Sequence, residues 1–419
     1  MYRTYVKDIK VGKEVRLNGW LHEIRDLAKV KFLLLRDYSG IIQCVVVSDN
    51  KEMFDLVPKL KQEMAVEIKG KAVENKVAKL GYEVQVDSIE VLGDVSQVLP
   101  IQVVEKGEIN TDLSTRLDYR FLDLRKPEIH KIFKVRDEVY KTTVDFFKKN
   151  GFIAVNTPKL TSAGVESGAD MFAVDYFGEK AYLSQSPQIY KQMLVCSGFD
   201  SVFEIGTVFR AENSNTSRHQ TEFTGIDFEM AFVKDDNEIM DLVEEYMKEI
   251  VKNVSLDIKI DKIPRISMEE IKKMLKEKGK DLPEEEDLDS ESETLVGEII
   301  KEKFDSDFVF VTNFPWAVRP FYHVRNGKNG TKSFDLLFKG VEIATGSLRE
   351  HRYDVLKKQA EDKGVNLDEM KDYAIMFKCG APPHGGCGLG LDRIAQRLLD
   401  IENVREVVFL PRDPDRLRP

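Results

Sequence analysis

VFRAENSNTSRHQTEFTGIDFEMAF, residues 208–232, contains two apolar, strand-like stretches on either side of a long polar loop. Ordinary β-hairpins turn on Asn-Gly or Asp-Gly within about two to five residues, whereas this loop has no Gly. Its titratable side chains include Arg210, Glu212, Arg218 and His219. Such a loop is suited to hold an anionic ligand, because Arg binds phosphate through two parallel charge-assisted hydrogen bonds.

The segments around this hairpin alternate between strands and helices. The predicted strands are Phe203–Phe209, Phe223–Phe232, Phe308–Thr312, Ser333–Phe338 and Gly340–Thr345. Helical patterns cover Lys131–Lys149, Asp236–Val254, 353–364 and 389–399. Long strands joined in hairpins predict an antiparallel sheet with helices packed on it, which is an α+β fold and not a doubly wound one.

Residues 1–100 form a separate, β-rich unit. The predicted strands are Glu14–Leu21, Phe32–Arg36, Ile41–Val47, Val66–Ala72 and Tyr82–Leu92, with a helical stretch at Glu52–Lys61. Five strands with a helix after the third are typical of an OB-fold β-barrel. We therefore predict a barrel domain over 1–100, a polar hinge over 101–130 and an α+β domain over 131–419.

Composition limits the classes of function. The chain has 419 residues and a net charge of −10, which argues against indiscriminate binding of nucleic acid. Residues 1–35 nevertheless carry eight Lys or Arg and four Asp or Glu, a net charge of +4. Seven acids and no base lie between Pro283 and Glu293, which predicts a solvated loop.

The sequence also indicates the cellular compartment. No apolar run reaches the roughly 18 residues that a membrane span needs, and the N-terminus has no signal-peptide core. The cysteines form no C-x-x-C pair, which favours reduced thiols over a zinc or redox site. The four cysteines are Cys44, Cys196, Cys379 and Cys387. We therefore expect a cytoplasmic protein.

A nucleotide site is the first hypothesis for the charged loop. The chain has no P-loop motif, and GCGLGLDR at 386–393 lacks the third Gly of a dinucleotide fingerprint. Side chains would therefore hold the nucleotide: an Arg on a phosphate, a carboxylate on the adenine amine, and Phe223 stacked on the ring. Surface ion pairs and a core Phe remain the alternative at this point.

Two further blocks fit the same hypothesis. Asp335 and Glu342 reach one site if a bend or bulge lies between their strands, and with an oxygen from Thr345 they suit Mg²⁺ shared with substrate phosphates. The Gly-rich stretch 385–390 precedes a helix with Arg393 near its start, where an Arg meets a polyphosphate.

Together these blocks resemble the three signature motifs of class II aminoacyl-tRNA synthetases. The first is the helix followed by GFIAVNTPKL, the second FRAENSNTSRHQTEF and the third GLGLDR. LSQSPQIYKQM, RPFY, REHRYDVL and the ending VREVVFLPRDPDRLRP are similar to the archaeal type of aspartyl-tRNA synthetase, over essentially the whole chain. One departure is Leu348, where the family commonly has Gln.

The resemblance implies a role for each matching residue. Arg210 would be the catalytic residue, on the α-phosphate of ATP and the carbonyl of the amino acid. The implied ATP-binding residues are Arg210, Glu212, Arg218, His219, Phe223, Glu342 and Arg393. The implied aspartate-binding residues are Glu166, Gln188, Lys191, Arg210, Asp227, Thr345 and Arg349. The implied Mg²⁺ ligands are Asp335, Glu342 and Thr345, and the implied anticodon-binding residues are Arg25, Phe32 and Gln43.

The implied activity is ATP-dependent ligation of aspartate to tRNA-Asp by a homodimer. An asparaginyl-tRNA synthetase is the nearest alternative, and Lys191 argues against it. A non-catalytic RNA-binding paralogue is the other alternative, and the complete set of nucleotide-binding residues argues against it. Whether tRNA-Asn is also charged stays open, although His22, in the domain that reads the anticodon, favours relaxed specificity.

Overall fold

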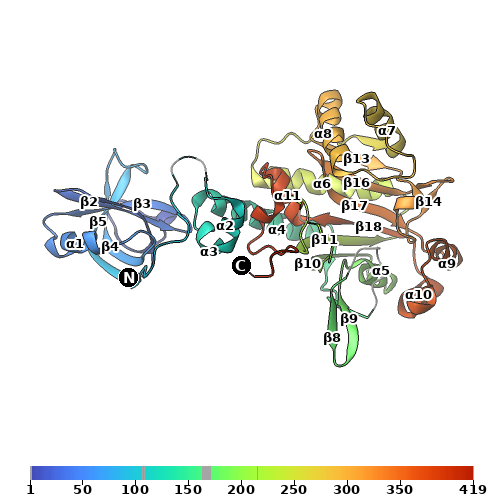
Figure 1. The fold of residues 1–419 in the computed structure, drawn as a ribbon, viewed down its shortest axis with the longest axis horizontal. Coiled ribbons are helices and arrows are strands. Elements are labelled where there is room, and N and C mark those ends of the chain that lie inside the picture. Colours follow the sequence, from blue (N-terminus) through green and yellow to red (C-terminus); the bar gives the residue numbers. More distant parts are fainter. Residues whose placement is uncertain (1, 106, 108, 163–170, 215, 419) are drawn as a thin grey trace. The chain divides into compact units, whose positions relative to one another are not determined.

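The computed structural model describes residues 2–105, 107, 109–162, 171–214 and 216–418. Contacts divide the chain into two compact units, Met1–Pro127 and Glu128–Pro419 (Figure 1). The predicted domain limits at 100 and 130, with a hinge between them, stay predictions. Among the described residues, no helix is both long and apolar enough to cross a membrane.

The first unit contains a closed five-stranded barrel of order β1-β2-β3-β5-β4. The strands are β1 (Glu14–Asp26), β2 (Val30–Asp37), β3 (Gly40–Val47), β4 (Ala65–Glu74) and β5 (Tyr82–Gly93). Helix α1 (Lys51–Leu56) follows the third strand, as the OB-fold prediction required, and Asn50 caps it. Alternate residues such as Leu33 and Leu35 are fully buried inside the barrel. The OB-fold prediction is confirmed.

The segment after the barrel is not featureless. It contains α2 (Leu113–Asp118) and α3 (Arg120–Asp123). Arg116 and Arg120 both donate hydrogen bonds to the buried carboxylate of Asp123. Arg125 donates to Glu63 of the barrel at 3.1 Å and lies 5.0 Å from the Trp20 ring centroid, so this segment is anchored to the barrel through polar contacts.

The second unit is built on an eight-stranded sheet of order β12-β13-β16-β17-β18-β11-β10-β6. The strands are β6 (Ile153–Ala154), β10 (Ser201–Phe209), β11 (Glu222–Ala231), β12 (Arg265–Ser267), β13 (Phe308–Thr312), β16 (Ser333–Phe338), β17 (Val341–Arg349) and β18 (His384–Gly390). Pairing is antiparallel from β13 to β10, and the two edge strands β12 and β6 pair in parallel. The predicted antiparallel sheet is confirmed.

Helices and smaller sheets surround this sheet. The helices are α4 (Pro127–Lys149), α5 (Gln188–Cys196), α6 (Asp236–Val254), α7 (Met268–Glu277), α8 (Ser290–Phe304), α9 (Tyr353–Asp362), α10 (Lys371–Lys378) and α11 (Leu391–Leu398). The small strands are β7 (Leu160–Thr161), β8 (Ala173–Tyr176), β9 (Glu179–Leu183), β14 (Arg325–Asn326) and β15 (Gly330–Thr331). Figure 1 shows β8 and β9 as a projecting hairpin. One core cluster joins α4, α6 and α11 to the sheet through residues such as Phe147, Tyr246 and Ile394.

Two differences from the sequence prediction bear on the site. Strand β17 continues to Arg349, beyond the predicted end at Thr345. The acidic segment 283–293 is not a loop throughout, because α8 begins at Ser290 with Asp289 as its N-cap. Acids in the first turn of a helix interact favourably with the helix dipole, which explains this start. The prediction of a solvated loop is therefore wrong for residues 290–293.

Candidate active site

A cavity of about 360 Å³ lies against the central strands of the second unit. Its walls come from β10, β11, β17 and β18, from the starts of α5 and α11, from residues 319–323 and from the 210–221 loop. Predicted residues that line it are Gln188, Lys191, Arg210, Glu212, Arg218, His219, Phe223, Asp227, Glu342, Thr345, Arg349 and Arg393. Asp335 does not line the cavity, and Glu166 lies outside the described residues.

Strand register explains why residues so far apart in the sequence meet. Asp227 faces Gly388, Gly388 faces Thr345, and Thr345 faces Asp335, so the four lie in one row across β11, β18, β17 and β16. Opposed residues share a face of the sheet. Polar side chains from three strands, β11, β17 and β16, are therefore presented on one face, with Gly388 of β18 between Asp227 and Thr345.

A β-bulge brings Glu342 onto the same face as Thr345. The pairing of β16 with β17 shifts after Leu336, which leaves Ile343 as the extra residue. Residues three apart on a regular strand point to opposite faces, and the bulge cancels this alternation. Thr345 Oγ1 donates a hydrogen bond to Glu342 Oε1 at 3.0 Å. The bulge that the Asp335–Glu342 prediction required is present.

Glycines in β18 make room for the carboxylates of β11. A Cβ atom at position 386 would lie 2.1 Å from the Phe228 carbonyl oxygen and 2.2 Å from Glu229 Oε2. A Cβ atom at position 388 would lie 3.1 Å from Asp227 Oδ1. The Gly-rich motif therefore allows the side chains of Asp227 and Glu229 to lie over the neighbouring strand.

We expect Gly386→Ala to destabilise the protein by about 1–3 kcal/mol, because the added methyl group overpacks a site bounded by backbone. The matched control is Gly93→Ala, whose Cβ atom would only make an ordinary 3.5 Å contact with Ala65. Urea unfolding measures the stability of both variants. Equal unfolding midpoints for Gly386→Ala and Gly93→Ala would contradict this expectation.

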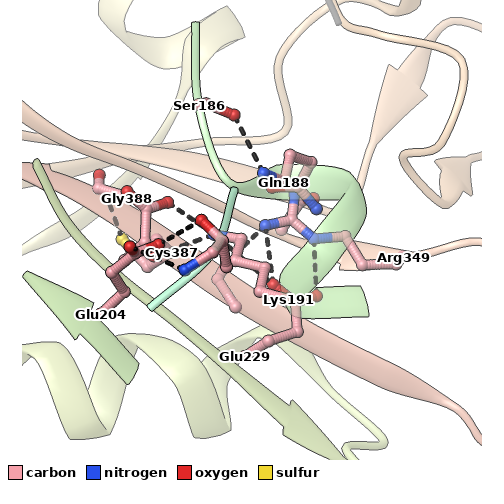
Figure 2. A network of polar contacts seen from close by, with 12 residues as sticks. Ser186, Gln188, Lys191, Glu204, Glu229, Arg349, Cys387 and Gly388 are labelled. Carbon is pink, nitrogen blue, oxygen red and sulfur yellow. Dashed lines mark hydrogen bonds and ion pairs between the residues drawn. The ribbon is translucent and has the colours of Figure 1, made fainter. Parts of the chain in front are cut away.

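The cationic part of the cavity contains Lys191 and Arg349 (Figure 2). Lys191 Nζ donates to Asp227 Oδ1 at 2.9 Å and lies 3.6 Å from Glu229 Oε2. Arg349 Nε donates to Glu229 Oε1 at 3.0 Å. Burial opposes ionisation of Glu229, but Arg349 and Lys191 hold the pKa of this fully buried carboxyl below its usual value. Two cations and two carboxylates thus form a compact network.

Glu229 is a functional candidate that the sequence prediction missed. It has no exposed surface and orients both cations, so it acts through them. The available signal was the spacing, because Asp227 and Glu229 are two apart on one strand and must share a face.

At the cationic end of the cavity, the buried Nε2 of Gln188 has no hydrogen-bond partner among the described residues, and it remains free for a ligand.

The polar loop lies at the other end of the cavity. Arg210 Nη1 is 3.8 Å from Glu212 Oε1, and the Arg210 guanidinium lies 5.3 Å from the Phe223 ring centroid. His219 Nε2 is 4.0 Å from Glu212 Oε2, and burial together with the Arg393 charge lowers the pKa of His219. Phe223 is only partly buried, so the core alternative for its ring is wrong. A cationic loop with an accessible ring suits a purine nucleotide.

Arg218 and Arg393 are held by acceptors on neighbouring elements. Arg218 Nη1 donates to Glu293 Oε2 at 2.9 Å and Nη2 donates to Thr294 Oγ1 at 2.9 Å, both at the start of α8. Arg393 Nη1 donates to the Glu342 carbonyl oxygen at 2.9 Å. Burial and the nearby Glu342 carboxylate raise the pKa of Glu293 to about 7. Glu293, predicted as part of a solvated loop, is thus a partner of the site.

The predicted metal ligands are only partly gathered. Asp335 Oδ2 accepts a hydrogen bond from Arg319 Nη2 at 2.6 Å, and Arg319 lines the cavity whereas Asp335 does not. Asp335 Oδ1 is buried and has no hydrogen-bond partner in the described chain, and burial raises the pKa of Asp335 to about 7. An unsatisfied carboxylate oxygen beside Glu342 and the Thr345 hydroxyl fits a hard divalent cation, which prefers oxygen ligands.

Within the described residues, no group of three or more His, Cys, Asp or Glu side chains could hold a metal alone. Mg²⁺ at nucleotide sites commonly needs only one or two carboxylates, because substrate phosphates complete its shell. Arg319 was missed as a cavity residue. It is buried and stacks 3.7 Å from the Phe314 ring centroid.

The predicted anticodon residues share the outer face of the barrel in the first unit. Arg25 pairs with Phe32 across β1 and β2, and Gln43 pairs with Leu34 across β2 and β3. Phe32 is only partly buried, between the inward-facing Lys31 and Leu33. Arg25 Nε donates to Glu23 at 2.8 Å, and Gln43 Nε2 donates to Glu83 at 2.7 Å. An aromatic ring between polar side chains suits a single-stranded base.

Comparison with known proteins agrees with this geometry. The chain matches the family described as "tRNA synthetases class II (D, K and N)" over residues 112–414, and the "OB-fold nucleic acid binding domain" over residues 15–92. It is 39% identical to the aspartate–tRNA(Asp) ligase of Pyrococcus abyssi, covering 100% of this chain and 99% of that protein. It is 42% identical to the aspartate–tRNA(Asp/Asn) ligase of Methanopyrus kandleri, with the same coverage.

A solved structure is similar over the whole chain. It is the asparaginyl-tRNA synthetase of Pyrococcus horikoshii complexed with asparaginyl-adenylate, with a TM-score of 0.92 and 31% identity over 100% of both chains. In that protein the fold holds asparaginyl-adenylate, an amino acid joined to a nucleotide.

Proposed function

Because this chain belongs to the class II tRNA synthetases of the aspartate, lysine and asparagine group, as its motifs predicted, we propose that it is an aspartate–tRNA ligase. It activates L-aspartate with ATP to aspartyl-adenylate and transfers the aspartyl group to tRNA-Asp. The observation that carries the choice of amino acid is the pair of buried cations, Lys191 and Arg349, at one end of the cavity. Full-length curated relatives named as aspartate–tRNA ligases support this function over an asparagine-specific one.

The protein acts by positioning and by charge stabilisation. The aspartate α-carboxylate attacks the α-phosphate and pyrophosphate leaves, so the protein itself forms no covalent bond. Arg210 stabilises the charge that develops on the α-phosphate, since a positive charge already placed beside the reacting atoms needs little reorganisation during reaction. Glu212 binds the adenine amine, Phe223 stacks on the adenine ring, and Arg218, His219 and Arg393 bind the β- and γ-phosphates.

The amino acid lies between α5 and the sheet. Gln188 and Asp227 hold the α-amino group, and Lys191 and Arg349 face the side-chain carboxylate. Glu166 remains a predicted residue of this pocket. Asp335, Glu342 and Thr345 would hold Mg²⁺, which neutralises charge on the phosphates when it is bound.

Exchange of pyrophosphate into ATP tests the proposal directly. We expect exchange that depends on aspartate, with much weaker exchange on asparagine. Exchange with asparagine alone would identify an asparaginyl-tRNA synthetase. Absence of exchange with either amino acid would favour the non-catalytic RNA-binding paralogue.

The choice of tRNA needs its own experiment. The two relatives compared above differ in the tRNA that their names give, tRNA-Asp in one and both tRNAs in the other. His22 Nδ1 accepts a hydrogen bond from Arg36 Nη1 at 2.8 Å, and Arg36 also donates to Glu63. The imidazole ring of His22 therefore has a defined position in the barrel. We propose relaxed specificity, with both tRNA-Asp and tRNA-Asn charged. Charging of tRNA-Asp only would contradict it.

The barrel face should act only in the tRNA step. Phe32→Ala should lose roughly 1–3 kcal/mol of base stacking, which raises the KM for tRNA in aminoacylation. Aspartate-dependent pyrophosphate exchange should not change, because it needs no tRNA. Leu34→Ala, two residues along the same face, is the matched control. Equal losses in both reactions for Phe32→Ala would show a structural role.

We also propose a homodimer that works in the cytoplasm, where translation takes place. The first signature motif covers α4 and β6, and it exposes Tyr140 and Ile153. β6 is an edge strand of the sheet, which leaves one side available for a partner. Light scattering after gel filtration measures the oligomeric state.

A further inference from the structure

His323 is a buried histidine that the proposed mechanism does not use. It is 2% exposed and lines the cavity beside Arg349. Its Nε2 lies 3.3 Å from Arg349 Nη1, and its Nδ1 has no hydrogen-bond partner within the described part of the chain. A buried unpaired donor costs stability, so its presence in a native structure calls for a compensating role.

The charges around the ring keep it neutral. Burial, together with Arg349, Arg319 and Lys191, lowers the pKa of His323 well below its usual value. A neutral imidazole carries one proton, and Arg349 Nη1 is only a donor. Nε2 must therefore accept from Arg349, which places the proton on Nδ1.

Every N–H group of the Arg349 side chain donates a hydrogen bond. Nε and Nη2 donate to the two oxygens of Glu229 at 3.0 and 3.4 Å, and Nη2 also donates to the Gly386 carbonyl at 3.2 Å. Nη1 donates to Ser347 Oγ at 2.6 Å and to His323 Nε2. An Arg side chain has five N–H groups, so each one has an acceptor here.

The His323 contact differs from the other four. Glu229, Ser347 and Gly386 belong to the strands β11, β17 and β18, whereas His323 approaches from the segment that follows residues 319–322. Its backbone is rigid, because it forms a β-bridge with Arg349 and its carbonyl accepts from Gln359 Nε2 at 3.1 Å. His323 thus limits rotation of the guanidinium from a segment that lies beside β17.

We propose that His323 is a positioning residue for amino acid selection. Through Nε2 it fixes Nη1 of Arg349 in the orientation that receives the side-chain carboxylate of aspartate. A substrate carboxylate is a stronger acceptor for Arg than a serine hydroxyl, so on binding it takes over the Nη1 hydrogen bond to Ser347, while His323 Nε2 keeps the other Nη1 hydrogen bond. This inference rests on the proposed aspartate activity and adds a residue to its specificity.

Two substitutions distinguish the roles of the two ring nitrogens of His323. In His323→Gln, the side-chain amide places an oxygen near the position of Nε2 and retains the acceptor. In His323→Asn, the shorter amide reaches only the position of Nδ1, so the acceptor for Arg349 Nη1 is lost. We expect His323→Asn to raise the KM for aspartate in pyrophosphate exchange by roughly tenfold or more, the value of one hydrogen bond to a charged group. His323→Gln should recover most of this loss.

The KM for ATP is the internal control. It should change less than twofold in both variants, since His323 contacts no predicted ATP-binding residue, and its retention also shows that the variants fold. The ratio of aspartate to asparagine activity should fall in His323→Asn. Equal aspartate KM values for His323→Asn and the parent protein would overturn the inference, and so would equal losses in the Asn and Gln variants. A parent protein that does not use aspartate would instead overturn the proposed function.

Discussion

Arg210→Ala should lower the rate of aspartate-dependent pyrophosphate exchange by about 10²–10³-fold or more. Removal of one preorganised donor from a developing oxyanion costs this much in other enzymes, and Arg210 adds a full positive charge to its hydrogen bonds. The expected loss lies in kcat, because the charge on the α-phosphate is greatest in the transition state.

The structure supports an effect on chemistry and not on folding. The Arg210 side chain is 46% exposed, and its closest ion-pair partner, Glu212, is 3.8 Å away. Exposed pairs of this kind contribute little to stability, so the variant should unfold at nearly the same urea concentration. Arg325→Ala is the matched control, since Arg325 is exposed and does not line the cavity. Near-normal exchange by Arg210→Ala would remove this residue from the catalytic role.

The second large effect concerns the choice between aspartate and asparagine. The two amino acids have nearly the same shape, so only charge and hydrogen-bond polarity distinguish them. Lys191 and Arg349 offer only donors, and neither can accept a hydrogen bond from an amide NH₂ group. Asparagine would leave a donor facing its NH₂ group and a buried cation without a substrate charge. Sites that leave polar groups unpaired reject analogues by roughly 10⁴–10⁵-fold without editing, and we expect this preference for aspartate.

Lys191→Met tests this account. Met has a similar length and no charge, so it removes the cation that lies 2.9 Å from Asp227. The KM for aspartate should rise far more than the KM for ATP, and the preference over asparagine should narrow. The parent protein must be measured with both amino acids in the same exchange assay. Equal activation of the two by the parent protein, or an unchanged KM and kcat for aspartate in Lys191→Met, would contradict the proposed selection.

The contacts around Lys191 and Arg349 refine the prediction from sequence. The resemblance implied two cations that face the substrate, but in the structure both are already paired with Asp227 and Glu229. The substrate carboxylate must therefore join or replace existing acceptors. The buried carboxylates keep two close cations stable before aspartate arrives, because unpaired buried charges are costly.

The sequence was sufficient to predict the architecture, and its motifs marked twelve of the residues that line the cavity. Hydrophobic periodicity is a local property, so it marked α6 and β13 to the residue, and it marked the five strands of the barrel. The charged loop at 210–221 and the Gly-rich strand at 385–390 were also visible, because unusual composition needs no partner to be recognised.

Which of these residues share a face, and which partners they have, depends on the tertiary structure. The bulge at Ile343 turns Glu342 toward Thr345, the register of β18 places Gly386 beside Glu229, and a β-bridge sets His323 against Arg349. Each depends on pairing between segments far apart in the chain, which local patterns do not encode. The prediction of a solvated loop at Glu293 was wrong for the same reason. Its neighbours in the sequence are acidic, and only the fold places Arg218 beside it.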